Sequence, residues 1–204
     1  MEKGHDHAKK PRKAIAMRPR MMSSQGAGRT LRIFTIGHST RSFNEVLELL
    51  DSNGVNELVD VRSYPSSRKF PQWDQAAIEE ALPGNIGYRW IRDVGGRRHS
   101  PKGFNSPNNG WRVKAFRDYA DYMATEQFQT GLAELMQVAN ESVPVIMCSE
   151  AVPWRCHRRL ITDALIVAGV SVFNIMSATS TQRAEMTPFA KVQNGNIIYP
   201  EPEA

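Results

Sequence analysis

Apolar and polar positions alternate in blocks along the chain, and each block has the period of a strand or of a helix. Short apolar runs predict five strands, at 31–36, 55–61, 86–91, 143–147 and 170–175. Apolar residues that recur every three or four positions predict helices around 43–52, 74–82, 116–123, 128–139 and 160–168. Helices that alternate with strands indicate parallel pairing, so we expect an α/β fold: an open, mainly parallel sheet of about five strands with flanking helices.

Local signals mark where several of these elements begin and end. Ser42 and Glu45 have the spacing of a capping box, which begins the helix after the first strand. Asp74 is placed to cap the next helix. Asn194-Gly195 stands between two strand-like runs, as in a type I′ turn, so we expect a C-terminal β-hairpin beside the sheet.

The charge of the chain is unevenly distributed. The formal net charge is +5, yet residues 1–30 alone carry +6 and the remainder carries −1. The first segment has few bulky apolar side chains, so we expect a disordered basic tail at 1–30 and a single α/β domain at 31–204. A nearly neutral domain argues against general nucleic-acid binding, which requires a basic face.

Composition and missing signals exclude several classes of protein. Two cysteines cannot build a disulfide framework, and no run of roughly 18 apolar residues exists that would span a bilayer. The first thirty residues lack the apolar segment of a secretory signal, so we expect a cytoplasmic protein without a membrane partner. Gly26-Ala27-Gly28 precedes the first strand instead of following it, and no P-loop motif occurs, so we expect no cofactor.

Reactive and charged side chains gather directly after the predicted strands. In an open parallel sheet, ligands bind outside the carboxyl ends of the strands, so residues at these ends converge. The candidate site residues chosen on this ground are His38, Ser39, Asp60, Arg62, Gly95, Gly96, Arg97, Cys148, Glu150, Arg155, His157 and Arg158. We expect them to surround one concave surface with Cys148 at its floor.

Cys148 is the candidate nucleophile. It precedes a predicted helix, and we expect Arg155, His157 and Arg158 to lie on the first turn of that helix. The helix dipole and these cations favour a thiolate, which predicts a pKa below the ordinary value of about 8.5. Glu150 is placed either to act as a general base or to orient His157.

The arginines indicate the substrate. Four arginines carry guanidinium groups, which bind phosphate or carboxylate through two parallel hydrogen bonds: Arg62, Arg97, Arg98 and Arg158. We therefore predict an enzyme that acts on an anionic small molecule, a class that includes nucleotides. Its reaction would take place in a Cys/Glu/His/Arg pocket at the carboxyl ends of the strands.

Several candidates also have a purely structural interpretation. Asp60 and Arg62 are spaced to form a local ion pair. His38 can satisfy backbone groups of a tight turn, and Gly95-Gly96 can serve only to permit a turn. Cysteine packs well as a small buried hydrophobe, which is the better interpretation of Cys156.

Five separated motifs carry a likeness to one bacterial and archaeal family. They are Thr35-Ile36-Gly37-His38-Ser39, Val59-Asp60-Val61-Arg62 followed by Pro65, Gly95-Gly96, Cys148-Ser149-Glu150 and Cys156-His157-Arg158. In order and chemistry they resemble the family catalogued as domain of unknown function 488, over about residues 31–176. The resemblance implies an α/β fold with a polar pocket, and it implies neither a reaction nor a cofactor.

A second likeness is to rhodanese-like domains. Those domains also have Asp-Val-Arg at a strand end and a cysteine loop around a helix N-terminus; here Asp60-Val61-Arg62 and Cys148 occupy the corresponding places. The loop after Cys148 is longer, however, and Glu150 puts a carboxylate where a sulfur-transfer loop presents amide donors. Because the strand-end motif and the cysteine loop still correspond, sulfur transfer is kept as an alternative function.

Two further alternatives use the same residues. As a nucleic-acid-binding module, the chain would hold phosphates with these arginines and the basic tail, and stack bases on Tyr64 and Trp154. As a metal-binding protein, it would draw sulfur, nitrogen and oxygen ligands from Cys148, Glu150, Cys156, His157 and His38. Neighbours such as Cys156 and His157 face different ways on a helix, so we assign no metal ligand.

Overall fold

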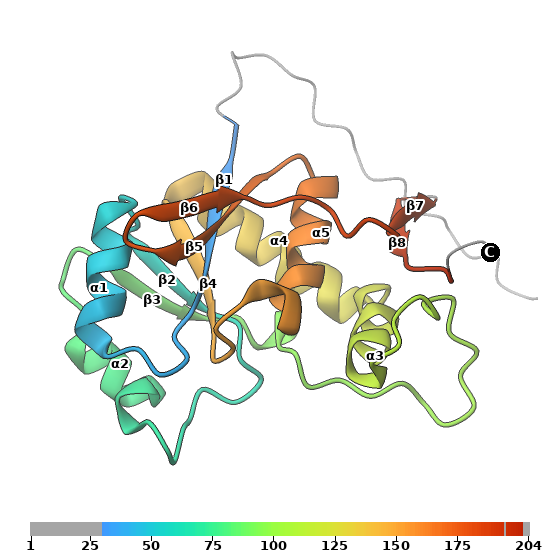
Figure 1. Cartoon of the computed structure of the whole chain (residues 1–204), viewed down its shortest axis with the longest axis horizontal. Coiled ribbons are helices and arrows are strands. Elements are labelled where there is room, and N and C mark those ends of the chain that lie inside the picture. The colour runs from blue at the N-terminus through green and yellow to red at the C-terminus, as the bar shows by residue number, and fades with distance from the viewer. Residues whose placement is uncertain (1–29, 194, 202–204) are drawn as a thin grey trace, which may run out of the picture.

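The computed structural model describes residues 30–193 and 195–201, and its centre is a six-stranded sheet (Figure 1). Across the sheet the strands follow the order β3-β2-β4-β1-β5-β6. Their bounds are β1 Arg32–Gly37, β2 Glu57–Asp60, β3 Gly87–Trp90, β4 Pro144–Cys148, β5 Ser171–Ser177 and β6 Ser180–Arg183. Strands β1 to β5 pair in parallel, as the alternation of strands and helices predicts.

The sequence pattern does not predict β6, which pairs antiparallel with β5. The strand consists of four polar residues, most of them exposed. An edge strand that is solvated on both faces has no apolar period, so hydropathy does not reveal it. The mainly parallel sheet therefore has one more strand than expected, an antiparallel edge of the kind common in α/β folds.

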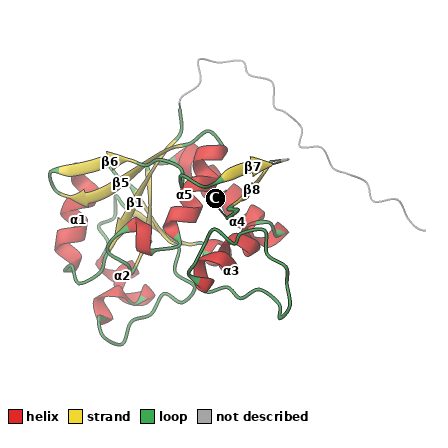
Figure 2. Ribbon diagram, turned by 45° about the vertical axis from the view of Figure 1, so that its right-hand side comes forward, coloured by secondary structure: helices red, strands yellow, loops and turns green. Residues whose placement is uncertain are grey.

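In the described part of the chain, five α-helices connect the strands. They are α1 Phe43–Ser52, α2 Gln75–Ala81, α3 Lys114–Met123, α4 Glu126–Glu141 and α5 Arg158–Val167, with 3₁₀ turns at Pro71–Trp73, Arg92–Val94 and Pro153–Arg155. Figure 2 shows α1 and α2 on one side of the strands and α3, α4 and α5 on the other. The predicted α/β fold is confirmed.

Two hydrophobic cores lie on opposite faces of the sheet, because successive side chains of a strand point to opposite faces. In β4, Ile146 packs in the core that holds α3, α4 and α5, whereas Val145 and Met147 pack in the core that holds α1 and α2. In β1, Ile33 and Ile36 divide between the cores in the same way. The central strands are thus buried on both faces, which explains why β4 is apolar without alternation.

The helix caps follow the sequence signals in part. Ser42 and Glu45 form the predicted capping box: the Glu45 amide donates to Ser42 Oγ at 3.2 Å, and the Ser42 amide donates to Glu45 Oε2 at 2.6 Å. Asp74 directly precedes α2, but its side chain makes no capping hydrogen bond. Asp74 Oδ1 accepts instead from the Ser67 amide at 2.5 Å, so it holds the loop after β2 against the start of α2.

The C-terminal hairpin is present and is anchored to α5. Strand β7, Lys191–Gln193, pairs antiparallel with β8, Asn196–Ile198, which confirms the prediction. Gly195 has the positive φ, 81°, that a type I′ turn requires, and Asn194 lies outside the described residues. Beyond β8, Tyr199 is fully buried, and its hydroxyl donates to Asp163 Oδ2 at 2.8 Å.

The expected disordered tail at 1–30 lies, apart from Thr30, outside the described residues. No helix in the described ranges is both long and apolar enough to cross a bilayer. A cytoplasmic location stays a prediction.

We expect Tyr199→Phe to lower the free energy of unfolding by about 2 kcal/mol, because it removes a hydrogen-bond donor from the buried Asp163 carboxylate. Urea denaturation followed by circular dichroism measures this change. Tyr64→Phe is the control, since the Tyr64 side chain is exposed, and it should shift the value by less than about 0.5 kcal/mol. Equal unfolding curves for wild type and Tyr199→Phe would contradict the anchoring role.

Candidate functional site

A cavity of about 820 Å³ opens at the carboxyl ends of the strands. Its walls come from the loops after β1, β2, β3 and β4, from the start of α5 and from the start of α3. The candidate residues that line it are His38, Ser39, Arg62, Gly96, Arg97, Cys148, Glu150, Arg155 and His157. Asp60, Gly95 and Arg158 do not line the cavity, and each instead contacts a residue that does.

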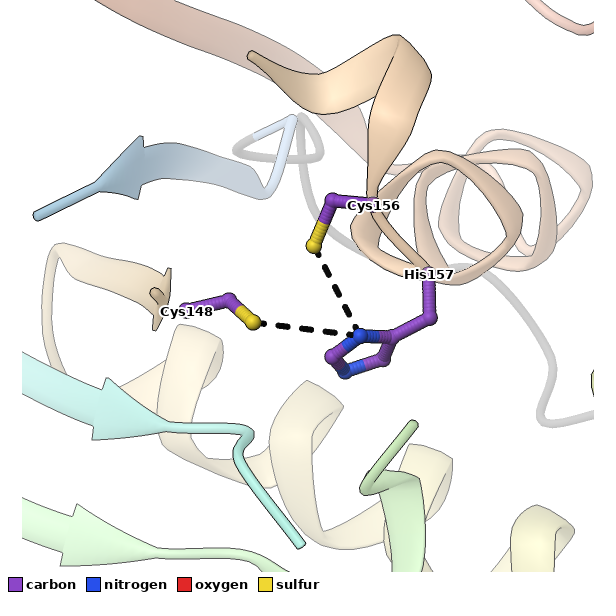
Figure 3. A group of neighbouring side chains, drawn as sticks. All are labelled: Cys148, Cys156 and His157. Carbon is purple, nitrogen blue, oxygen red and sulfur yellow. Dashed lines mark hydrogen bonds between the residues drawn. The ribbon is translucent and has the colours of Figure 1, made fainter. Parts of the chain in front are cut away.

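Two sulfur atoms and one imidazole nitrogen meet at one point of this cavity (Figure 3). His157 Nδ1 lies 3.6 Å from Cys156 Sγ and 3.9 Å from Cys148 Sγ, and all three atoms lie within 4.8 Å of one another. Both cysteines are buried and neither is in a disulfide. We call these three residues the Cys–His cluster.

The backbone around Cys156 explains how two sequence neighbours reach one point. Cys156 ends a 3₁₀ turn with extended backbone (φ −132°, ψ 148°), whereas His157 is already helical (φ −58°, ψ −18°) and precedes α5. The premise that both residues lie on a helix and face different ways is therefore wrong. Arg155 also lies outside α5, in the 3₁₀ turn, so the expected first turn carrying Arg155 and His157 is wrong as well.

The imidazole of His157 is held in one orientation. Its Nε2 lies 2.9 Å from the carbonyl oxygen of Val61, which can only accept, so Nε2 carries the hydrogen. Nδ1 then faces the two sulfur atoms. Tyr119 packs edge-on against the ring, and a Cβ at Gly96 would overlap it.

Arg158 is a buried cation beside the Cys–His cluster. Its side chain is about 1% exposed, and within the described residues no carboxylate lies at ion-pair distance from it. Its Nε donates to Cys156 Sγ at 3.4 Å, Nη1 to Thr35 Oγ1 at 3.2 Å and Nη2 to the Glu150 carbonyl at 2.6 Å. A buried guanidinium requires a counter-charge, and the Cys156 sulfur is the group among these three that can supply one.

The two thiols have opposite pKa shifts. Burial raises the pKa of Cys156, but the hydrogen bond from Cys148 and the charge and hydrogen bonds of Arg158 outweigh it and lower this pKa to about 6. The hydrogen bond that the Cys148 thiol donates to Cys156, together with burial, raises the pKa of Cys148 to about 12. The expected lowering of the Cys148 pKa is therefore wrong: the lowered pKa belongs to Cys156, the thiol that accepts the Arg158 hydrogen bond and that the sequence assigns to packing.

Asp60 and Arg62 form the local ion pair that their spacing allows. Both are buried; Arg62 Nε lies 3.0 Å from each oxygen of the Asp60 carboxylate, and Nη2 lies 2.5 Å from Oδ2. Tyr88 donates a further hydrogen bond to this carboxylate. Burial lowers the pKa of Arg62, but its bonds to Asp60 outweigh that and raise it above the ordinary value. Asp60 therefore holds a wall residue in place and does not reach the cavity.

His38 stacks on Trp73 with ring centroids 4.4 Å apart and is 2% exposed. Its Nδ1 lies 3.2 Å from the carbonyl oxygen of Ser39, so this nitrogen carries the hydrogen. The other nitrogen, Nε2, is a buried acceptor with no hydrogen-bond partner among the described residues. Burial first, and then the charge of Arg62, lower the pKa of His38 to about 4, so the ring is neutral.

The two glycines after β3 provide space, and neither has a left-handed backbone. A Cβ at Gly95 would crowd Ser63, and one at Gly96 would overlap the His157 ring. A further glycine, Gly37, ends β1 where a Cβ would overlap the Glu150 carbonyl. These positions let the loops after β1, β3 and β4 approach closely enough to form the cavity.

The cavity rim carries the exposed charges. Arg97, Arg155 and Glu150 all line the cavity with exposed side chains. The Arg97 amide donates to Ser63 Oγ at 2.7 Å, and its guanidinium lies 5.7 Å from the Tyr64 ring centroid. The rim is thus anchored through the backbone of Arg97, and within the described residues none of these three charged groups forms an ion pair.

Sequence reasoning missed part of the wall. Ser63, Ser66 and Ser67 line the cavity in the loop after β2, and their place directly after a strand end was the available signal. Phe116 lines it from α3, which no local pattern indicates. A possible metal-ligand set within the described residues is the Cys–His cluster itself, which includes neither Glu150 nor His38.

Residues 42–165, more than half of the chain, match the family model described as Domain of unknown function DUF488. The match contains the loops after β2, β3 and β4 and the start of α5, but ends short of the expected 31–176 and omits His38 and Ser39. Comparisons with curated proteins and with solved structures found no match, so the likeness to rhodanese-like domains stays a prediction.

We expect chelator-treated protein to form one thiolate near pH 6 and the second only near pH 12. The ultraviolet absorbance of the thiolate, followed against pH, measures both steps. Cys156→Ala should abolish the step near pH 6, whereas Cys148→Ala should move it upward because the sulfur loses a hydrogen-bond donor. Two thiols that both titrate near the ordinary value of about 8.5 would contradict this assignment.

Acid should destabilise the protein through His38. Its folded pKa of about 4 lies below the unfolded value of about 6.5, so the stability it contributes is present above pH 6.5 and is lost as the pH falls toward 4. Between neutral pH and pH 4 the wild type should lose about 3 kcal/mol more unfolding free energy than His38→Phe, which keeps the stacking on Trp73. His99→Phe, at an exposed histidine, is the control, and equal acid dependence in all three proteins would contradict the burial of a neutral His38.

Proposed function

This chain belongs to the family described as domain of unknown function DUF488, and because that description assigns no reaction, we propose a function from its site: an enzyme that acts on a small molecule bearing a phosphate or carboxylate group. The substrate binds in the cavity at the carboxyl ends of the strands, and the reaction takes place at the Cys–His cluster. One observation carries the proposal: a cavity of about 820 Å³ brings together the exposed guanidinium groups of Arg97 and Arg155 and the sulfur of Cys156, to which the buried Arg158 donates a hydrogen bond. This volume lies within the range of roughly 300–1,000 Å³ for ligand pockets.

The charge of the wall favours an anion. Arg62, Arg97 and Arg155 line the cavity together with one carboxylate, that of Glu150. Arg62 is neutralised by Asp60, whereas the guanidinium groups of Arg97 and Arg155 form no ion pair within the described residues. These two groups are free to bind a phosphate or carboxylate through paired hydrogen bonds.

The groups that react are the Cys–His cluster and Glu150. Arg158 and Cys148 both donate hydrogen bonds to the Cys156 sulfur, which favours a thiolate there, and Nδ1 of His157 faces both sulfurs. The Glu150 carboxylate has no hydrogen-bond or ion-pair partner within the described residues, so it is available to exchange a proton with the bound molecule.

His38 adds a requirement on the substrate. Its Nε2 is a buried acceptor that no group in the described part of the chain satisfies, and His38 lines the cavity. Buried acceptors are almost always satisfied in native proteins, so we expect an N–H or O–H group of the substrate to donate to Nε2. The substrate therefore carries a hydrogen-bond donor as well as an anionic group.

Replacing the rim arginines should weaken anion binding. We expect Arg97→Gln and Arg155→Gln each to weaken the binding of inorganic phosphate, and of a nucleoside monophosphate, about tenfold, since each removes a charge-assisted hydrogen bond. Isothermal titration calorimetry measures the affinity. Arg112→Gln, at an exposed arginine outside the cavity, is the matched control and should leave it unchanged.

The same probes test whether the anion site and the Cys–His cluster form one site. Saturating phosphate should slow the alkylation of Cys156 by iodoacetamide in wild type, and should do so less in Arg97→Gln. Conversion of phosphorylated or carboxylated metabolites by wild type, absent from Cys156→Ala, would then identify the reaction. Absence of phosphate binding, or alkylation that phosphate does not affect, would overturn the proposal.

Nucleic-acid binding is the competing outcome of this test. A nucleic-acid module would bind a short single-stranded oligonucleotide with an affinity that falls steeply with salt and is unchanged in Cys156→Ala. The enzyme proposal expects weak oligonucleotide binding instead, and expects Cys156→Ala to lose turnover.

A further inference from the structure

We propose that the Cys–His cluster is a metal site: Cys148, Cys156 and His157 bind one divalent ion of the zinc class, whose fourth position opens into the cavity. The inference rests on the proposed function in placing the reaction at this cluster. It adds the group that would contact the substrate there, and metal binding can be measured without any substrate.

The separations within the cluster fit a tetrahedral ion. Zinc binds sulfur at about 2.3 Å and imidazole nitrogen at about 2.0–2.1 Å, so tetrahedral ligands place a sulfur and a nitrogen about 3.6 Å apart. The observed separations are 3.6 Å for Cys156 and 3.9 Å for Cys148. Two sulfur ligands lie about 3.8 Å apart around such an ion, and all three atoms here lie within 4.8 Å of one another. The side chains therefore need little movement to become ligands.

The nitrogen ligand is oriented before any ion binds. His157 donates from Nε2 to the Val61 carbonyl at 2.9 Å, which leaves Nδ1, directed at the sulfurs, as its ligand atom. Histidine ligands of metal sites almost always donate their second ring nitrogen in this way. The close approach of Gly96 and the edge-on contact of Tyr119 keep the ring in this orientation.

The sulfur ligands have surroundings that suit a metal-bound thiolate. Arg158 donates from Nε to Cys156 Sγ at 3.4 Å, a hydrogen bond that orients the sulfur and moderates its charge. Two thiolates neutralise a divalent ion, so the loaded cluster and Arg158 together carry +1. A centre with that charge on the wall of the cavity is matched to an anionic substrate.

The number and type of ligands indicate the ion and its role. Two sulfurs and one imidazole select zinc-class ions over magnesium or calcium, which prefer oxygen. Three protein ligands with an open fourth position are typical of catalytic zinc sites, whereas structural sites have four. All three ligands line the cavity, so the open position faces the space where the substrate binds. Glu150 lies in the same wall outside the ligand set and stays free for proton transfer.

The direct test is cobalt and zinc binding to the purified full chain after treatment with a chelator. We expect one equivalent of Co²⁺ per chain to produce thiolate-to-metal charge-transfer absorption, which Zn²⁺ then displaces. The chain contains two cysteines in all, so this absorption reports Cys148 and Cys156 whatever other residues bind cobalt. Absence of charge-transfer absorption in the wild type would overturn the proposal without any need for a variant.

Variants then test the ligand set. Cys148→Ser, Cys156→Ser and His157→Gln should each weaken zinc affinity more than about 100-fold in competition with a chromogenic chelator, because each removes a ligand. His99→Gln, at an exposed histidine outside the cluster, is the matched control and should bind zinc like the wild type. Circular dichroism establishes that each variant is folded, and unchanged affinity in a folded His157→Gln would exclude the nitrogen ligand.

These experiments can reject the metal site and the proposed function independently of each other. If cobalt binding is absent but phosphate still protects Cys156, the metal site is wrong and the anion-binding enzyme stands. If cobalt binds with charge-transfer absorption but the phosphate affinity is the same in wild type and Arg97→Gln, the metal site stands and the proposed substrate class is wrong.

Discussion

The buried guanidinium of Arg158 is the constraint on which the site depends. Taking a cation out of water costs several kcal/mol unless a counter-charge and hydrogen bonds replace the solvent. Arg158 has three acceptors, which belong to β1, to the loop after β4 and to Cys156. Only the sulfur can become negative, so burial of Arg158 and deprotonation of Cys156 stabilise each other. Two of these hydrogen bonds, to Thr35 and to the Glu150 carbonyl, hold the start of α5 against β1 and the loop after β4.

The order of the strands brings the rest of the site to that point. Strand β4 lies between β2 and β1, so Cys148 at its end is flanked by the loops that carry His38 and Val61. Val61 orients His157 across 96 positions of sequence, and Gly96 leaves room for the ring. The cluster is therefore a product of the sheet order, of one 3₁₀ turn and of close approach at glycine.

The cavity is surrounded by buried charged groups and by exposed ones, and the two kinds have different roles. Buried charges are compensated within the protein, as in the Asp60–Arg62 pair and the Cys156–Arg158 pair. Rim charges are not, because Arg97 and Arg155 have exposed guanidinium groups without an ion-pair partner in the described part of the chain. The first kind keeps the reactive groups in place, and the second is available to a ligand. Since a metal-loaded cluster with Arg158 would be positive, both the rim and the proposed metal centre favour an anion.

The sequence predicted how helices and most strands alternate along the chain, together with the capping box and the hairpin. It also predicted that the candidate site residues lie at the carboxyl ends of the strands. Each depends on local periodicity or on residues adjacent to a strand end, and the family motifs are of the same local kind. The polar edge strand β6 had no hydropathy signal, so only its pairing with β5 revealed it.

The roles of the two cysteines were decided by tertiary structure as well. The sequence favours Cys148 as the reactive thiol, but a thiol's pKa depends on which charges and donors lie within a few ångströms. Those come from Arg158, His157 and the other cysteine only after folding. The change of backbone conformation at Cys156 likewise turned two sequence neighbours toward one point, because the direction of a side chain follows from the φ and ψ that tertiary packing selects.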